Sequence, residues 1–316
     1  MSNRAPKVIV ITLNWNGKKW LADCLDSVQT LDYPNYEVVL VDNGSTDDSV
    51  ATVKSRYPAI HVVETGSNLG YSRGFNAGMA FATTLGAEYF LIMNNDTIID
   101  PMALAALVET AQTQERAGFV TGKIYFHDTP HTFQTVGKKE DPILWNGNHI
   151  GWDEEDAGQY DQPAERAFVD DVMVLVNRRV YDELGGYDAQ YYLQSEGFDW
   201  QVRAKKKGWK IYYTPNAKLW HKVSQSMGGF GNPIGRYFDT RSRVVVMARH
   251  APWHRFLLFY LHTGWKTTDS LLRGVVQRKP EKIKPRLARW LGFISGTFWL
   301  IHRQPATKIP ACIQHL

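Results

Sequence analysis

The sequence predicts an α/β protein: a doubly wound, mostly parallel sheet with helices on both faces, followed by a C-terminal helical extension. Apolar runs rich in β-branched residues alternate with amphipathic segments through about the first 120 residues, a rhythm typical of parallel sheets. Each apolar run ends in turn residues or short polar side chains. After residue 236 the chain is rich in aromatic and basic residues, a composition typical of surface helices.

Continuous apolar runs predict buried strands, because strands covered on both faces do not alternate. These runs are Val8–Leu13, Val38–Val41, Ile60–Val63 and Tyr89–Met93. Amphipathic spacing and caps predict helices at Trp20–Leu31, at Phe75–Leu85, and from Asp100-Pro101 to about Glu115. Residues 45–48 have the spacing of a capping box, which predicts another helix there. Loops after parallel strands gather at one sheet edge, where ligands bind in such folds.

The rhythm changes between residues 120 and 170. His127–Asp161 is rich in Gly, Asp, His and aromatic residues, and it predicts a loop-rich insertion with short antiparallel strands. Regular elements are expected again at Val172–Val176, Arg178–Leu184, Glu196–Lys207 and Lys210–Tyr213. We therefore expect one domain over residues 1–235, with two halves that meet near residue 120, and a helical tail over residues 236–316.

Composition excludes several classes of protein. The 316 residues are 44% apolar and 22% charged, which is ordinary for a folded domain and unlike a disordered or collagen-like chain. Cys24 and Cys312 are too few for a disulfide framework or a Cys-rich zinc site. The net charge is +4, but residues 251–316 hold eleven Lys/Arg against two Asp/Glu. The basic tail is expected to meet an anionic partner, either membrane head groups or nucleic acid, or else to be a solvated basic face.

No targeting or membrane-spanning segment is expected. The N-terminus passes into the first strand without the apolar region of a signal peptide. The two most apolar stretches of the tail, Phe256–Trp265 and Leu287–Ile301, are shorter than the roughly 20 residues that span a bilayer. A cytoplasmic location is therefore predicted, with peripheral contact to the membrane left open.

Polar residues at the strand ends are candidates for binding a nucleotide. Asp42 ends the second strand, where a carboxylate can accept a hydrogen bond from a base or ribose or can simply stabilise a turn. Residues 66–78 contain spaced glycines, Asn68, Asn76 and Arg73 ahead of a helix. Such a segment can bind a diphosphate through backbone amides and a guanidinium, or can be a glycine-rich turn that packs on the sheet.

A second group of residues is suited to a cation and to proton transfer. Asp96 follows Asn94 and Asn95 at the end of the fourth strand, where it can hold a hard divalent cation. His221 is either a second, nitrogen ligand for a metal such as Mn²⁺ or a packed core histidine. Glu196 and Asp199 share one helix face with Arg203, which predicts either a general base or a row of surface ion pairs.

Taken together, the motifs resemble those of family 2 glycosyltransferases with the GT-A fold. They are V-D-N-G-S-T-D at 41–47, N-L-G-Y-S-R-G-F-N-A-G at 68–78, N-N-D at 94–96, G-G-Y-D at 185–188, E-G-F-D-W at 196–200, and His221. The resemblance covers about two-thirds of the chain, and residues 236–243 are similar to bacterial rhamnosyltransferase-like members. It implies that residues 1–235 form a catalytic domain, with the nucleotide in the first half and the acceptor in the second.

The resemblance also implies roles for individual residues. Asp42 would read a uracil or thymine base, Thr12 and Asn14 would line the base pocket, and Arg73 would lie near the nucleotide. The other nucleotide-binding candidates are Asn68, Asn76, Asn94 and Asn95. Asn94-Asn95-Asp96 takes the place of the family's D-x-D motif, and His221 would be the second ligand of a divalent cation, Mn²⁺ or Mg²⁺.

One departure from the family pattern concerns the general base. In the family's E-D-x-D pattern the second acidic residue takes the proton of the acceptor, and here that position is Gly197. Glu196 is the nearest substitute and Asp199 is the next. The remaining alternatives are that Asp170 or Asp171 serves instead, or that catalysis is impaired.

The implied function is inverting transfer of a sugar from a UDP- or dTDP-sugar to a hydroxyl of a glycan or lipid-linked glycan, as in polysaccharide biosynthesis. Aromatic residues between 127 and 200, among them Trp145, Trp152 and Trp200, are expected to bind the acceptor. The tail is expected to bind a membrane surface, or to pack on the catalytic domain or on a second subunit of a homodimer.

Three rival functions remain open. A nucleotide-sugar-binding protein with impaired catalysis would explain Gly197. A sugar nucleotidyltransferase would need a Gly-rich, basic loop after the first strand, and residues 14–18 are a poor version of one. Binding of nucleic acid by the tail has no supporting motif, so nucleic acid is not expected as a partner.

Overall fold

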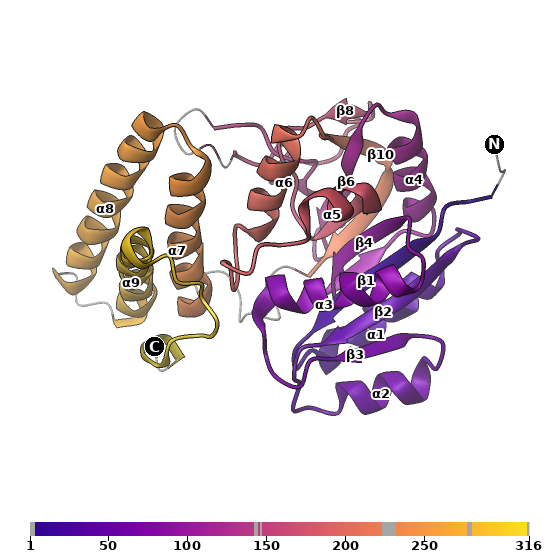
Figure 1. The fold of residues 1–316 in the computed structure, drawn as a ribbon, viewed down its shortest axis with the longest axis horizontal. Coiled ribbons are helices and arrows are strands. Elements are labelled where there is room, and N and C mark those ends of the chain that lie inside the picture. The colour runs from indigo at the N-terminus through magenta and orange to yellow at the C-terminus, as the bar shows by residue number, and fades with distance from the viewer. Residues whose placement is uncertain (1–3, 142–144, 146, 223–231, 277–279, 315) are drawn as a thin grey trace.

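The computed structural model describes residues 4–141, 145, 147–222, 232–276, 280–314 and 316, and it shows one large sheet flanked by helices with a helical bundle at its side (Figure 1). The strands are β1 (Val8–Asn14), β2 (Tyr36–Asp42), β3 (His61–Glu64), β4 (Tyr89–Asn94), β5 (Thr97–Ile99), β6 (Ala117–Phe126), β7 (Phe133–Thr135), β8 (Ala164–Glu165), β9 (Met173–Asn177) and β10 (Lys210–His221). The helices beside the sheet are α1 (Lys18–Gln29), α2 (Ser49–Arg56), α3 (Gly70–Thr84), α4 (Ala103–Thr113), α5 (Arg178–Leu184) and α6 (Glu196–Lys206).

The sheet order is β3-β2-β1-β4-β9-β6-β10-β5, with β7 beside β6 and β8 beside β10. β3, β2, β1 and β4 are parallel, and β9 then runs antiparallel to both β4 and β6. The predicted doubly wound α/β fold is confirmed, with a parallel first half and a mixed second half. The carboxyl ends of β1 and β4 lie side by side, so Asn14 and the Asn94–Asp96 turn meet at one edge.

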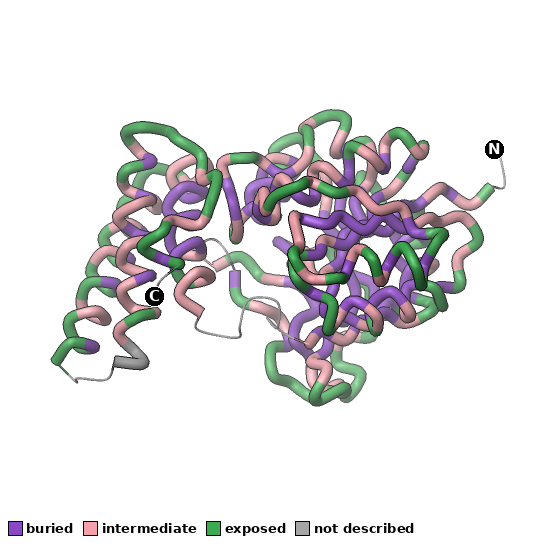
Figure 2. The backbone as a smooth tube through the Cα atoms, turned by 90° about the horizontal axis from the view of Figure 1, so that it is seen from below, coloured by how far each residue is buried: buried purple, intermediate pink, exposed green. Residues whose placement is uncertain are grey.

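Both faces of the sheet are buried, which explains the continuous apolar runs. Ile9, Ile11 and Phe75 belong to the core on the α3 face, whereas Val8, Val10 and Leu25 belong to the core on the α1 face. Figure 2 shows the buried backbone concentrated in the sheet region, while the helical bundle is mostly half-buried or exposed.

Element ends differ from the predictions where side chains compete for the backbone. Ser45 does not cap a helix, because its hydroxyl accepts from Asn14 Nδ2 and from the Asn16 amide, and α2 begins only at Ser49. The predicted strand at Lys210–Tyr213 continues to His221, since a register shift against β6 between Tyr213 and Lys218 lets the strand accommodate Pro215.

The C-terminal tail is helical, with α7 (Pro233–His250), α8 (Trp253–Val276), α9 (Pro280–His302) and the short α10 (Ala311–Gln314). α7 and α9 pack so closely at Gly292 that a Cβ there would overlap the carbonyl oxygen of Tyr237. α8 lies at the outer side of the bundle (Figure 1) and exposes a row of apolar side chains. Within the described residues, no helix combines the length and the apolar content needed to cross a bilayer.

Candidate active site

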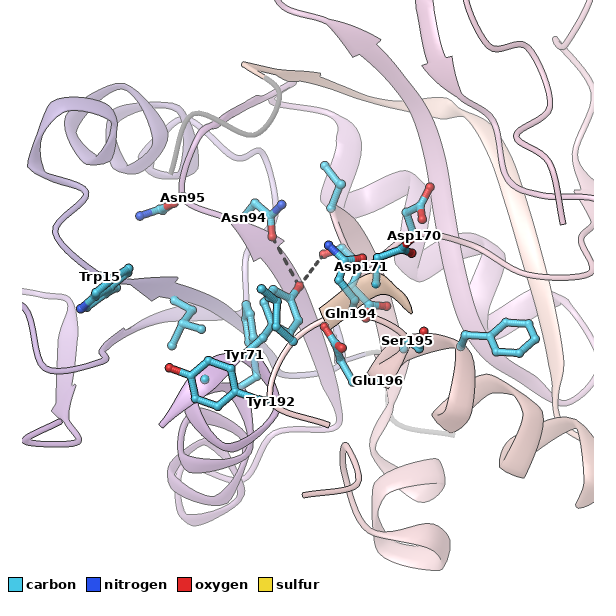
Figure 3. Close-up of a pocket in the computed structure, with 18 of the residues that line it drawn as sticks. Trp15, Tyr71, Asn94, Asn95, Asp170, Asp171, Tyr192, Gln194, Ser195 and Glu196 are labelled. Atoms are coloured by element: carbon cyan, nitrogen blue, oxygen red, sulfur yellow. Dashed lines mark hydrogen bonds between the residues drawn. The ribbon is translucent and has the colours of Figure 1, made fainter. Parts of the chain in front are cut away.

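A cavity of about 450 Å³ lies between the carboxyl edge of the sheet, the N-terminus of α6 and the start of α7 (Figure 3). Six of the residues predicted from the sequence line it: Asn68, Asn94, Asn95, Asp96, Glu196 and His221. The structure therefore brings together residues separated by up to 153 positions, because the strand ends and the loop before α6 converge at this edge.

Three other predicted residues are buried, and two of them, Asn14 and Asp42, belong to a polar network that includes Asn95. Asn14 Nδ2 donates to Asp42 Oδ1 at 3.3 Å, and Asn14 Oδ1 accepts from Asn95 Nδ2 at 3.0 Å. Asp42 Oδ2 also accepts from the Ser45 amide at 3.0 Å, and Thr12 is fully buried. None of the three lines the cavity, and through Asn95 the network orients a side chain that does.

Arg73 and Asn76 do not line the cavity either. Arg73 Nη2 donates to the carbonyl of Ala189 at 3.3 Å, and Asn76 bonds both the amide and the carbonyl of Tyr187. These contacts join α3 to the segment that leads into α6. In this arrangement neither side chain lines the cavity, and contact of Arg73 or Asn76 with a nucleotide stays a prediction.

The N-terminus of α3 differs from the expected phosphate cradle. The Gly70 amide donates to Asn68 Oδ1 at 2.9 Å, and the Tyr71 amide donates to the Tyr192 carbonyl at 2.8 Å. Two of the first amides of the helix are thus already engaged, so we do not place a diphosphate there.

Asp96 and His221 face each other across 3.2 Å, from Asp96 Oδ1 to His221 Nε2, and both are buried. His221 Nδ1 lies 2.8 Å from Gln134 Oε1, which suits a ring that donates from Nδ1. The Nε2 lone pair then points toward the carboxylate, an arrangement that a bound cation would satisfy. In the described residues no three or more His, Cys, Asp or Glu side chains are arranged to hold a metal ion together, so substrate oxygens would have to complete such a site.

Glu196 begins α6 and reaches the cavity from a constrained backbone. Gln194 and Ser195, directly before it, have φ of 68° and 69°, a conformation that residues other than glycine rarely adopt. The Glu196 side chain is 6% exposed, and its Oε2 has no hydrogen-bond partner among the described residues. Burial, together with the nearby charge of Asp171, raises the pKa of Glu196 above the ordinary carboxyl value.

Asp199, the alternative base, lies outside the cavity. Its Oδ1 is 2.6 Å from His250 Nε2, and its Oδ2 accepts from Arg203 Nε at 2.7 Å. Arg249 Nη1 is 3.3 Å from Oδ1, and Tyr191 donates to the same oxygen. Burial opposes ionisation, but the His250 hydrogen bond and the two arginine charges lower the pKa of Asp199. The structure does not bring Asp199 to the site.

Asp170 and Asp171 both line the cavity, in different electrostatic environments. Asp170 forms an ion pair with Lys138 and lies 3.2 Å from His149 Nδ1. These two residues lower the pKa of Asp170 against the effect of burial. Burial and the charge of Asp170 raise the pKa of Asp171 instead.

Aromatic residues near the cavity differ from those predicted. Trp15, Tyr71 and Tyr192 line it, whereas Trp145, Trp152 and Trp200 do not. Trp200 is 1% exposed and packs edge-on against Phe119, so it is a core residue. Trp15 is 42% exposed. Its position directly after a buried strand, at the ligand-binding edge, was the sequence signal for a site residue.

Known proteins show similar sequences and folds. Residues 7–185 match the family model described as glycosyl transferase family 2. A Mycobacterium tuberculosis N-acetylglucosaminyl-diphospho-decaprenol L-rhamnosyltransferase is 26% identical over 69% of this chain and 76% of its own. A Staphylococcus epidermidis poly-beta-1,6-N-acetyl-D-glucosamine synthase is 22% identical over 73% of this chain and 54% of its own.

Two solved structures share the fold. A Pyrobaculum calidifontis mannosyltransferase in complex with GDP-Man and Mn²⁺ superposes with a TM-score of 0.59 at 17% identity, over 96% of this chain and 89% of that one. Residues 1–349 of S. aureus TarS superpose with a TM-score of 0.53 at 15% identity, over 98% and 83% of the chains. With the family model matching more than half of its length, the chain belongs to glycosyltransferase family 2, and it is a sugar-transferring enzyme with the GT-A fold.

Proposed function

We propose that the protein transfers a sugar from a nucleoside diphosphate donor to a hydroxyl of a glycan or lipid-linked glycan, with inversion at the anomeric carbon. The observation that carries this proposal is the cavity itself. It holds the Asp96–His221 pair, which suits a cation, together with two carboxyls, Asp171 and Glu196, whose pKa values are raised. These two features suit sugar transfer. A cation offsets the negative charge that develops on the leaving diphosphate, and a carboxylate takes the proton of the acceptor hydroxyl.

The donor would lie along the sheet edge. Asn68, Asn94 and Asn95 offer amide groups to ribose and phosphate oxygens, and the exposed ring of Trp15 offers a face on which a base can stack. The buried Thr12, Asn14 and Asp42 act indirectly in this proposal, since Asn14 holds Asn95. Uridine and thymidine donors follow from the sequence resemblance.

A divalent cation, Mn²⁺ or Mg²⁺, would be held by Asp96 and His221. When bound, it would supply positive charge that stabilises the departing diphosphate. The protein's own residues prepare that site: Gln134 fixes the His221 ring, and the β10–β5 pairing places His221 opposite Thr97, next to Asp96. A carboxylate of the cavity then accepts the proton of the incoming hydroxyl.

The acceptor is proposed to be presented at an anionic membrane surface. α8 exposes Leu258, Leu261, Trp265, Leu272 and Val275, each 57–66% exposed, along one side of a 24-residue helix. Basic residues exceed acidic ones by nine over residues 251–316, so negatively charged lipid would attract this tail. A lipid-linked acceptor is consistent with the diphospho-decaprenol named for the M. tuberculosis relative.

Nucleotide binding and turnover test the core of the proposal. We expect UDP or dTDP to raise the Tm only when Mn²⁺ or Mg²⁺ is present, since ligands that bind the folded state stabilise it. Asp96→Asn should remove this metal-dependent shift, and Asp32→Asn, on an exposed residue, is the matched control. No shift with any nucleoside diphosphate, and no release of nucleotide from UDP-, dTDP- or GDP-sugars, would contradict the proposal.

Vesicle flotation tests the membrane surface. The full chain should float with anionic vesicles and stay behind with neutral ones, and Leu258→Ser/Trp265→Ser should weaken flotation. Loss of a dimer in the same variant, without any vesicle binding by the unaltered chain, would instead show that α8 is a subunit interface.

A further inference from the structure

We propose that Asp171 is the catalytic base, and that its carboxylate reaches, from the strand side, the space that an acidic side chain at position 197 would otherwise occupy. The inference rests on the proposed function and names the residue that takes the proton of the acceptor hydroxyl in that reaction. The family pattern places an acidic residue at position 197, where this chain has glycine. The chain thus lacks the expected side chain but has a carboxylate in the same place.

The geometry at Gly197 is specific. A Cβ built on Gly197 would lie 2.5 Å from both Cγ and Oδ1 of Asp171, and closer still to Oδ2. Glycine is unfavourable within a helix by about 1 kcal/mol relative to alanine, yet it stands at the second residue of α6. Any larger residue at position 197 would have to displace the Asp171 carboxylate. The missing side chain of Gly197 thus leaves the space that the Asp171 carboxylate fills.

The sheet holds Asp171 at a fixed position relative to the donor edge. It precedes β9, and the Asn94 amide donates to the carbonyl of Val172 at 3.2 Å. The Tyr71 hydroxyl lies 3.3 Å from the Asp171 carbonyl oxygen and 3.4 Å from Asn94 Oδ1, so it bridges the two segments (Figure 3). A base must be placed accurately against the reacting atoms, and Asp171 is held to the same strand end as Asn94.

Four of the other carboxyls near the cavity are less suited to accept a proton, and the fifth, Asp239, comes from α7 and interacts with the charge of Arg289. Asp170 is held by Lys138 and His149, and Asp199 is held outside the cavity by Arg203, Arg249 and His250. Asp96 faces His221. Glu196 lies beside Asp171, and its buried Oε2 has no donor among the residues that the structure describes, so it favours keeping its proton while Asp171 loses its own.

The O–H bond of the acceptor breaks and its proton moves to Asp171 Oδ2. The acceptor oxygen bonds to the anomeric carbon from the side opposite the donor diphosphate. The bond from that carbon to the diphosphate oxygen breaks, and its electron pair leaves with the nucleoside diphosphate. Asp171 afterwards returns the proton to water.

An exchange of side chains tests the inference, with water as the acceptor and nucleotide release from UDP-, dTDP- or GDP-sugar as the readout. Asp171→Asn should lower the rate by about 10²–10⁴-fold, the contribution usual for a general base. The nucleotide-induced shift in Tm should be unchanged. Asp171→Gly should be equally slow, and adding Gly197→Asp should recover most of the loss by restoring a carboxylate from the helix side.

Three comparisons keep the outcomes distinct. Asp32→Asn, on an exposed residue, should behave as the unaltered enzyme. If the exchanged variant does not fold, the isosteric Asp171→Asn decides alone. A normal rate in Asp171→Asn, or a loss that coincides with lost nucleotide binding, overturns the inference while the unaltered enzyme still turns over. Absence of both turnover and nucleotide binding in the unaltered enzyme overturns the proposed function, and the inference falls with it.

Discussion

Two acidic residues of α6, one turn apart, have opposite surroundings. Glu196 lies in the cavity beside Asp171 and has no cationic partner in the described part of the chain. We call Glu196 and Asp171 the cavity pair. Asp199 is fully buried and contacts Arg203, Arg249 and His250, and we call these four residues the Asp199 cluster.

The contrast separates the proposed reactive site from a structural one. A buried carboxyl without compensation costs stability but keeps a proton available for chemistry. A buried carboxylate surrounded by cations holds elements together and does not titrate near neutral pH. Arg249 and His250 end α7, so the Asp199 cluster joins the catalytic sheet region to the helical tail.

The largest expected effect is on the Asp199 cluster. Asp199→Asn should lower the free energy of unfolding by about 3–5 kcal/mol, because it leaves Arg203 and Arg249 without their buried anionic partner. Urea denaturation measures this loss. Asp182→Asn, which breaks the exposed pair with Arg178, is the control and should cost less than about 1 kcal/mol. If both variants lose the same free energy of unfolding, the Asp199 cluster does not stabilise the fold more than an exposed ion pair does.

The next effect concerns the cation. The cavity is lined by Asp96, Asp170, Asp171, Glu196 and Asp239, and its lining lysine, Lys138, is paired with Asp170. A diphosphate therefore meets an acidic surface and needs added positive charge. Gln134→Leu should weaken Mn²⁺ affinity by about 10–100-fold, because His221 loses the group that orients it. Titration of Mn²⁺ at a fixed nucleotide concentration measures this. Unchanged affinity would mean that His221 does not bind the metal.

A smaller effect of opposite sign is expected for the cavity pair. The pKa of Glu196 is higher in the folded than in the unfolded protein, so the folded state holds its proton more tightly. Its contribution to stability is present at acidic pH and is lost as pH rises from the ordinary carboxyl value through the raised one. Glu196→Gln should therefore be more stable than the unaltered enzyme at pH 8, by roughly 1 kcal/mol, and no more stable at pH 4.

Thermal unfolding at the two pH values tests this sign. The charged and titratable groups around the cavity pair are Asp170, Lys138, Tyr71 and Tyr187, and the substitution removes none of them. For Asp199, whose pKa is lowered, the contribution is instead present at neutral pH and is lost under acid. A Glu196→Gln variant that is less stable at pH 8 would show that the carboxylate has a compensating partner.

Much of the site could be predicted because it depends on strand ends. Asn94, Asn95 and Asp96 follow an apolar run, and parallel strands deliver their ends to one edge, so their convergence with Asn68 follows from the fold class. His221 was predicted with Asp96, and the two side chains do face each other, although the strand that carries His221 is longer than predicted. Whether they bind a metal stays a prediction.

Arg73, Asn76 and Asp199 were placed differently because their partners are distant in sequence. Arg73 and Asn76 bond backbone groups more than 100 residues away. A motif specifies residue types at a spacing, but it does not specify which of them the chain uses to join its own segments.

The sequence by itself determined the α/β fold, the edge at which the site lies and the residue types available there, because these depend on local hydrophobic pattern and on the handedness of strand connections. Only the tertiary structure decided which carboxyl is paired and which is not. Asp199 meets His250 from α7, and Gly197 leaves room for Asp171 from the strand side. The charge state of a buried acid depends on the groups within a few ångströms of it, and packing, not sequence order, brings those groups there.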